Sequence, residues 1–369
     1  MTGQKCKLKC QACGSEYEIQ EPVWRCSCGG VLDIVCKHQV FEPDPERRGV
    51  WRYHRSLPVD SGTLISLGEG GTPVLEKEVR GLRVFFKLEY LNPTGSFKDR
   101  GSSVVVTHLK SLKVEKVVTD SSGNAGLSLA AYASAAGLSC RVYAPRSAPV
   151  GKKLLVRAYG AELVEVESRE AAAQAAQSDR GGFYAGHLWS PFFLEGCKTL
   201  AFEVFEEIGD VDAVVLPVGS GSLLLGVWRG FQELAGSGVA GKPPRLYAVQ
   251  AENNAPLFRE LYGREWVPES REVLADGIAV PAPPRLKQVA SAIRESGGDV
   301  VIVRNSSIPG ALKVFARMGF LVEPTSVVVL PALTELSERG ALDRGERVLV
   351  PLTGSGLKTL EKLSQLLSL

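Results

Sequence analysis

From Arg83 onward, short runs rich in β-branched residues alternate with amphipathic runs of helical length. Because neighbouring parallel strands need a long crossover, usually a helix, this alternation predicts parallel β-sheets covered by helices on both faces. The pattern therefore predicts an α/β fold. The expected strands are 83–90, 117–120, 141–144, 163–166, 213–218, 246–250, 300–303 and 347–350, and the clearest helices are 126–136, 194–208, 222–235 and 308–318.

Length and charge narrow the classes of function. A chain of 369 residues is long enough for two domains. Its 43 Lys+Arg against 41 Asp+Glu give a formal net charge of +2, which argues against a partner bound mainly through a polyanionic backbone. No secretory signal is expected, and the longest uncharged stretch, 213–228, is interrupted by Pro217 and is too short to span a bilayer. We therefore expect a cytoplasmic protein without nucleic-acid or membrane partners.

The N-terminal segment 1–40 is rich in cysteine, since six of the eight cysteines lie in the first 36 residues. Cys10 and Cys13, followed by Cys26 and Cys28, look like the two ligand turns of a zinc ribbon, although the second pair has one intervening residue where two are expected. Four thiolates suit tetrahedral Zn²⁺, and such a closed site would be structural. Disulfide bonding within this segment is the alternative.

Lys98 lies in the first of four loops that follow predicted strands. Pro93 and Gly95 turn the chain, and a helix is expected to start at or near 96–98. The positive end of a helix dipole lowers the pKa of an ammonium group, and only the neutral amine attacks a carbonyl. Lys98 is therefore a candidate Schiff-base lysine, although a lysine beside Asp99 and Arg100 would otherwise be a surface charge.

The other three loops are rich in glycine and hydroxyl side chains. The loop 121–124 precedes an Ala-rich helix and suits an anion such as an α-carboxylate, with a plain helix cap as the alternative. The loop 217–222 lacks a dinucleotide or P-loop pattern but suits a single phosphate, and 351–356 offers a hydroxyl at Thr353. A lysine beside such loops, without a histidine cluster or a catalytic triad, indicates pyridoxal phosphate.

The segment 92–101, Asn-Pro-Thr-Gly-Ser-Phe-Lys-Asp-Arg-Gly, resembles the cofactor-lysine motif of fold-type II pyridoxal-phosphate enzymes, the tryptophan synthase β-like superfamily. Its Lys-Asp-Arg-Gly ending resembles threonine synthases, whereas threonine dehydratases usually have another residue in place of Asp99. Residues 352–358 and the cysteine-rich start are also similar to threonine synthases. The order of the four loops matches the family from about Gly68 to the C-terminus.

This resemblance implies two parallel-sheet lobes, preceded by the small zinc-ribbon-like segment 1–40. The larger α/β lobe would comprise 41–90 and 188–369, the smaller mobile lobe 91–187, and the protein would be a homodimer acting on a small amino acid. Lys98 would form the internal aldimine and shuttle protons. By the same resemblance, the cofactor would contact Lys98, Phe97, Asn124, Gly219, Ser220, Gly221, Ser222, Leu223 and Thr353, and the substrate Ser121, Ser122, Gly123 and Asn124.

The implied reaction is that of a carbon–oxygen lyase acting on phosphate, which converts O-phospho-L-homoserine and water to L-threonine and phosphate. Three features depart from this family. Ala125 stands where threonine is frequent, Phe193 stands where an arginine would hold the phosphate, and 275–280 resembles dehydratases. Alternatives are a threonine/serine dehydratase (ammonia-lyase) and an O-phosphoserine-using β-replacement enzyme such as cysteate synthase. Other candidates to hold a substrate phosphate are Lys152, Lys153, Arg157 and Lys198.

Overall fold

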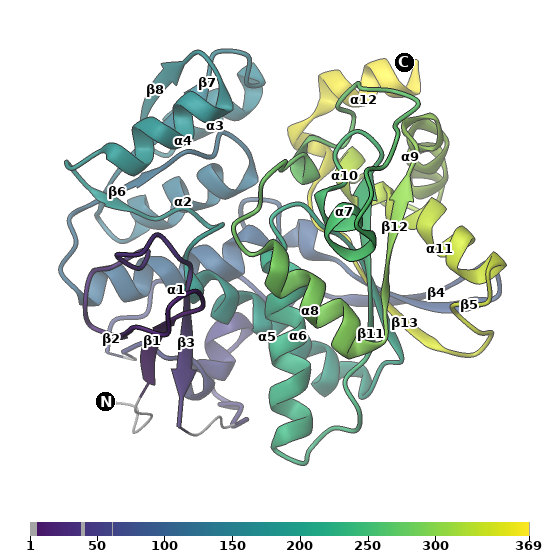
Figure 1. Cartoon of the computed structure of the whole chain (residues 1–369), viewed down its shortest axis with the longest axis horizontal. Helices are drawn as coiled ribbons and strands as arrows, with labels where there is room; N and C mark the ends of the chain where they lie inside the picture. Colours follow the sequence, from purple (N-terminus) through teal and green to yellow (C-terminus); the bar gives the residue numbers. More distant parts are fainter. Residues whose placement is uncertain (1–5, 38–40, 61, 369) are drawn as a thin grey trace. The chain divides into compact units, whose positions relative to one another are not determined.

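The computed structural model describes residues 6–37, 41–60 and 62–368, so His38 lies outside the described residues. The chain forms two compact units (Figure 1). Unit 1 comprises Met1–Gly71, Asn92–Thr94 and Lys98–Thr199, and unit 2 comprises Thr72–Leu91, Gly95–Phe97 and Leu200–Leu369. Among the described residues, no helix is long and apolar enough to cross a membrane.

Unit 1 is built on a four-stranded parallel sheet with the strand order β8-β7-β6-β9. Helices α2 and α4 both pack against β7, and α1 packs against α2. The strands are β6 (Lys116–Thr119), β7 (Ser139–Pro145), β8 (Glu162–Val166) and β9 (Phe183–Tyr184). The helices are α1 (Lys98–Ser111), α2 (Asn124–Ala135), α3 (Val150–Ala158), α4 (Arg169–Ser178) and the first half of α5 (Pro191–Ile208).

The cysteine-rich segment forms a small antiparallel sheet with the order β2-β1-β3. Its strands are β1 (Cys6–Cys10), β2 (Glu16–Glu18) and β3 (Leu32–Cys36). Cys6 and Cys36 are directly paired across β1 and β3 and form a disulfide. The 3-10 helix η1 (Gly49–Ser56) follows in the arm that leads to unit 2.

The unit boundaries differ from those that the sequence predicts. The prediction places boundaries after residues 40, 90 and 187. The chain passes between the two units at 71/72, 91/92, 94/95, 97/98 and, within α5, at 199/200, so the boundary near residue 90 agrees within one residue and the other two do not. Tertiary contacts explain the first difference. The ring of Trp24 packs on that of Tyr184 in β9 at 4.6 Å between centroids. The amide of Ile65 donates a hydrogen bond of 2.9 Å to the hydroxyl of Thr107 in α1, so the N-terminal arm is also held by unit 1.

Unit 2 is built on a six-stranded sheet with the order β12-β11-β10-β13-β5-β4, parallel except for the edge strand β4. Arg80 and Gly81, both with positive φ, form the tight turn between β4 and β5. The strands are β4 (Val74–Val79), β5 (Leu82–Lys87), β10 (Ala213–Pro217), β11 (Arg245–Ala251), β12 (Asp299–Val303) and β13 (Arg347–Pro351).

The helices of unit 2 cover this sheet. Helices α6 and α8 pack against β11, and α11 packs against β10 and β12. Buried aliphatic and aromatic side chains from the strands, such as Phe86, Val215 and Val249, join those of the helices in one core. The helices are the second half of α5, α6 (Ser222–Gly236), α7 (Pro256–Tyr262), α8 (Leu286–Ser296), α9 (Ile308–Arg317), α10 (Pro324–Val327), α11 (Val329–Glu338) and α12 (Leu360–Leu367). All eight predicted strands and the predicted α/β class are confirmed.

Candidate active site

Lys98 is the first residue of α1, and a buried carboxylate fixes the turn before it. Asp99, which is fully buried, accepts hydrogen bonds from the amide and the hydroxyl of Thr94 at 2.7 and 2.6 Å. It also accepts one of 2.6 Å from the hydroxyl of Ser128 in α2. Three hydrogen bonds to one carboxylate tie the turn, α1 and α2 together, so the backbone at Lys98 has little freedom.

The side chain of Lys98 lies beside aromatic groups. Its Nζ is 5.7 Å from the centroid of the Phe193 ring, and the ring of His187 lies edge-on to Phe193 at 5.6 Å. Gly101 leaves room for this arrangement, because a Cβ there would lie 2.4 Å from Cδ2 of Phe193. Burial, together with the charge of Lys98, holds the pKa of His187 well below its usual range. The imidazole next to the lysine is therefore neutral.

A small pocket of unit 1 opens between these side chains and the beginning of α2. Among the described residues that line it, two carry hydroxyl groups and none carries an ammonium, a guanidinium or a carboxylate. The lining residues are Ser102, Val105, Thr119, Ala125, Leu129, Ala185, His187 and Phe193. Two of the lining residues are neighbours of candidate site residues, since Ala125 directly follows Asn124 and the Phe193 ring lies 5.7 Å from Nζ of Lys98.

The loop 121–124 connects β6 to α2, and its residues are half-buried. The N-cap of α2 is Gly123, one of the residue types favoured at that position, and it makes no side-chain cap hydrogen bond, so a plain helix cap stays an alternative to an anion site. The loop folds back on the first turn of α2. A Cβ on Gly126 would lie 1.6 Å from the carbonyl oxygen of Ser121. The turn thus leaves the hydroxyls of Ser121 and Ser122 near a helix N-terminus, where an anion is stabilised.

The loop 217–223 of unit 2 is buried throughout. Gly221 is the N-cap of α6, with φ +81 and no side-chain cap hydrogen bond. A Cβ on Gly219 would lie 2.7 Å from the Cα of Ile278, so only glycine fits. The hydroxyls of Ser220 and Ser222 lie 3.1 Å apart. The loop thus combines two glycines that leave no room for a side chain, two hydroxyl groups and the N-terminus of a long helix. This combination suits the binding of a phosphate group.

Thr353 follows β13 in unit 2, and its hydroxyl lies 2.9 Å from that of Ser326 in α10. Its carbonyl accepts a hydrogen bond of 3.2 Å from the amide of Phe97. The segment 275–280 connects this region with the loop 217–223. Ile278 packs against Gly219, and the amide of Gly277 donates to the hydroxyl of Thr325 at 3.0 Å. Unit 2 therefore brings Phe97, Thr353 and the glycine loop together.

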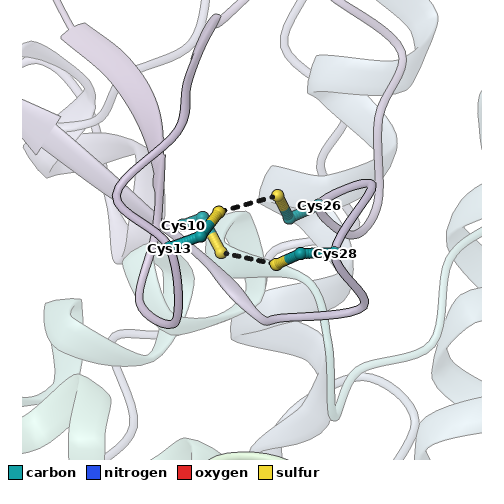
Figure 2. Close-up of side chains that lie close together, drawn as sticks. All are labelled: Cys10, Cys13, Cys26 and Cys28. Carbon is teal, nitrogen blue, oxygen red and sulfur yellow. Dashed lines mark hydrogen bonds between the residues drawn. The ribbon is translucent and has the colours of Figure 1, made fainter.

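The four candidate metal ligands of the cysteine-rich segment converge (Figure 2). Their Sγ atoms all lie within 4.8 Å of one another, with Cys10 and Cys28 at 3.5 Å and Cys13 and Cys26 at 3.6 Å. Four thiolates about 2.3 Å from a Zn²⁺ ion would be about 3.8 Å apart, so this spacing suits zinc. These four cysteines are free thiols, and the disulfide of the segment joins Cys6 to Cys36.

The second ligand turn, which has one residue between Cys26 and Cys28 where two are expected, still allows the four Sγ atoms to converge. A Cβ on Gly30 would lie 2.7 Å from the Sγ of Cys10, so this glycine, two residues after Cys28, lets the two turns approach each other.

Three of the four basic residues considered for a substrate phosphate already pair with carboxylates. Lys153 and Arg157 both contact Glu165, at 2.8 and 3.0 Å, and Lys198 contacts Glu195 at 2.5 Å. Lys152, the fourth, is buried in α3.

Sequence reasoning missed several residues of this site. The hydrogen bond between Asp99 and Ser128 joins residues 29 positions apart, and no local pattern predicts it. Phe193 stands out in the sequence only as a departure from a family pattern, and His187 only as one of four histidines. A signal that would have found them is the glycine at 101, since a glycine inside a helix implies close packing.

Comparisons with known proteins agree with this geometry. Residues 65–354 match the family model of pyridoxal-phosphate dependent enzymes. The chain is 36% identical to a threonine synthase of Methanocaldococcus jannaschii, with 95% of this chain and 92% of that protein covered. It is 32% identical to a threonine synthase of Methanosarcina acetivorans, again with 95% of this chain and 92% of that protein covered. Among solved structures, a pyridoxal 5'-phosphate-dependent aspartate racemase matches with a TM-score of 0.68 and 26% identity, covering 80% of this chain and 92% of that chain.

Proposed function

The chain belongs to the pyridoxal-phosphate-dependent enzymes and, among them, to the threonine synthases, and from this membership we propose that it converts O-phospho-L-homoserine and water to L-threonine and phosphate. The enzyme is a lyase of threonine biosynthesis with pyridoxal phosphate as its cofactor. The observation that carries the substrate assignment is the similarity to threonine synthases over almost the whole chain. The position of Lys98, next to the hydrogen-bonded Asp99 and 5.7 Å from the ring of Phe193, supports it.

The cofactor, when bound, withdraws electrons from the α-carbon of the substrate so that protons leave this carbon and the next one. In our proposal, Nζ of Lys98 holds the cofactor covalently and later carries those protons. The buried cradle of Gly219, Ser220, Gly221, Ser222 and Leu223 binds the cofactor phosphate through amides and hydroxyls. The hydroxyl of Thr353, which lies beside that of Ser326, would be the group that meets the ring nitrogen of the cofactor, and Phe97 would also contact the cofactor.

The loop of Ser121, Ser122, Gly123 and Asn124 would bind the carboxylate of the amino acid at the beginning of α2, and Asn124 would also contact the cofactor ring. His187 and Phe193 would exclude water from the pocket beside Lys98, because the neutral imidazole and the phenyl ring carry no charge. Keeping water away from this side of the substrate protects a carbanion-like α-carbon from a premature proton.

A dehydratase is the second candidate, and one observation favours it. The described lining of the pocket offers no cation, and Phe193 lies where an arginine would hold a phosphate. Burying a phosphate beside uncharged residues costs more free energy than burying the uncharged side chain of threonine or serine. This enzyme would release ammonia and an oxoacid.

Three further features complete the proposal. Cys10, Cys13, Cys26 and Cys28 bind a structural Zn²⁺, which metal analysis of the purified protein would detect at one ion per chain. The protein is a homodimer, as its resemblance to the family suggests, which its mass in solution would reveal. It acts in the cytoplasm on a small-molecule amino acid, in keeping with biosynthetic relatives, and cell fractionation would test this.

The decisive experiment measures phosphate and threonine released from O-phospho-L-homoserine by the cofactor-loaded enzyme. We expect both in equal amounts, and a loss of about a thousandfold or more in Lys98→Ala. Lys110→Ala is the matched control, because Lys110 lies in the last turn of the same helix. Ammonia from serine or threonine, without phosphate release from O-phospho-L-homoserine, would replace the first candidate by the second. Turnover of O-phosphoserine alone would point to a β-replacement enzyme.

A further inference from the structure

A tryptophan of the cysteine-rich segment packs against the parallel sheet of unit 1. Trp24 lies between Cys13 and Cys26 in the sequence, and its ring meets those of Tyr184 and Trp189 edge-on at 4.6 and 5.4 Å. Arg25 covers the Trp24 ring at 4.5 Å. Trp24, Trp189 and Tyr143 surround a buried cluster formed by Val118, Ala176 and Tyr184. The segment that carries the four thiols is thus attached through one aromatic side chain to the core of unit 1.

Tyr184 extends this contact to the substrate loop. It is 3% exposed, and its hydroxyl donates a hydrogen bond of 3.0 Å to Oδ1 of Asp120. Asp120 is the residue directly before the loop 121–124. Gly186 leaves space for the phenol, since a Cβ there would lie 2.3 Å from the Tyr184 oxygen. The hydrogen bond therefore fixes the end of β6 from which the loop starts.

The second aromatic partner of Trp24 lies close in sequence to the pocket. The amide of Trp189 donates a hydrogen bond of 3.0 Å to the carbonyl of Gly186, which closes a turn around His187. His187 itself lines the pocket beside Lys98. The two aromatic neighbours of Trp24 therefore support both the loop 121–124 and the turn that carries His187.

We propose that Trp24, Tyr184 and Asp120 are positioning residues through which a divalent metal ion of the Zn²⁺ type, bound by the four thiolates, strengthens the binding of the amino-acid substrate at the loop 121–124. No residue of the cysteine-rich segment touches the substrate in this scheme. The inference rests on the proposed function in one respect, namely that this loop binds an α-carboxylate. Coupling between two binding sites is reciprocal, so the amino acid must strengthen metal binding by the same factor.

The test uses the full-length, cofactor-loaded enzyme and L-threonine, whose binding is followed by the change in cofactor absorbance. Chelation of the metal is expected to weaken L-threonine binding about tenfold, and Tyr184→Phe, which removes only the hydroxyl, to do the same with the metal content unchanged. In that variant, chelation should have little further effect. Zinc affinity of the wild type should rise about tenfold with saturating L-threonine.

Tyr143→Phe is the matched control, because Tyr143 lies in the same aromatic cluster but its hydroxyl donates to Asp179, away from the loop. It should bind L-threonine like the wild type. Trp24→Phe is a second variant, which tests the same coupling if Tyr184→Phe does not fold. Unchanged L-threonine binding after complete metal removal would overturn the inference, as would a full metal effect in both variants. Because L-threonine binding is measured without turnover, failure of the proposed reaction would be seen separately, as absent phosphate release.

Discussion

The two loops proposed to hold the ligands differ in how their conformations are fixed. Both follow a parallel strand and begin a helix, but 217–223 is buried throughout, whereas 121–124 is half-buried. Packing fixes the first loop, because Gly219 and Gly221 lie against Ile278 and Val289 with no room for a Cβ. The second is fixed at its ends, by Asp120 and by the contact of Gly126 with Ser121. A cofactor that stays bound suits the first arrangement, and a substrate that exchanges in every turnover suits the second.

The largest effect should come from filling the buried loop. In Gly221→Ala, the new Cβ would lie 2.2 Å from Cγ2 of Val289 at a backbone φ of +81, which is strained for alanine. We expect pyridoxal phosphate to bind about a hundredfold more weakly, measured by titration of the apoenzyme. Gly236→Ala, at the other end of α6 with nothing within 4 Å, should bind it normally. Equal affinities in the two variants would contradict the assignment of this loop to the cofactor phosphate.

A substitution in the half-buried loop should affect the amino acid instead. Ser122→Ala removes one hydroxyl proposed to meet a carboxylate, and a hydrogen bond to a charged group contributes about 1.5–3 kcal/mol. We expect KM for the amino acid to rise about tenfold or more, with cofactor affinity unchanged. Ser134→Ala, at an exposed position of the same helix, is the control. If cofactor affinity fell as far as KM rose, the two loops would not have separate roles.

The smallest effect concerns stability, and it contrasts the two units because the histidines that the structure describes, His54, His108 and His187, all lie in unit 1. His108 in α1 stacks on Phe192 at 3.6 Å, and burial lowers the pKa of His108 to about 3. In the unfolded chain this imidazole titrates near 6.5, so the unfolded state takes up the proton first as the pH falls. The folded state is therefore stabilised above about pH 6.5 and loses that stability between about pH 6.5 and 3.

Replacing this histidine should flatten the pH dependence. At pH 5.5 the loss due to His108 is about 1.4 kcal/mol relative to neutral pH. The free energy of unfolding is measured with denaturant at pH 7.5 and 5.5. Between these pH values it should fall by about 1.4 kcal/mol less in His108→Gln than in the wild type. An identical fall in both proteins would mean that His108 is already accessible to protons in the folded state.

The parts of the fold that the sequence predicts are those with a strong local pattern. Strands such as β10 and β11 are buried runs of aliphatic residues between loops and are found easily. Strand β4 reads Val-Leu-Glu-Lys-Glu-Val, is mostly exposed at the sheet edge and is not found. Strand β9 has only two residues. The division into units depends on contacts such as Trp24 with Tyr184, which join distant residues and leave no periodic signal.

The candidate site shows the same limit. Lys98 and the glycine loops form short motifs at strand ends, where the topology of parallel sheets concentrates ligands, so their positions follow from the sequence. The pocket depends on His187 and Phe193 meeting Gly101 and Ala125 across α1, α2 and α5. Such side-chain contacts are set by helix packing and are visible only in the folded chain.

The disulfide between Cys6 and Cys36 closes a covalent ring that contains all four candidate metal ligands, with a sequence separation of 30 between its ends. Ring closure lowers the conformational entropy of the unfolded chain, which stabilises the folded state by about 3.6 kcal/mol for a loop of this length. The four thiols are therefore kept at a high effective concentration even when the small sheet has come apart. An oxidised chain should therefore recapture the proposed metal ion faster than a reduced one, so the disulfide would shorten the time that the site spends without its metal.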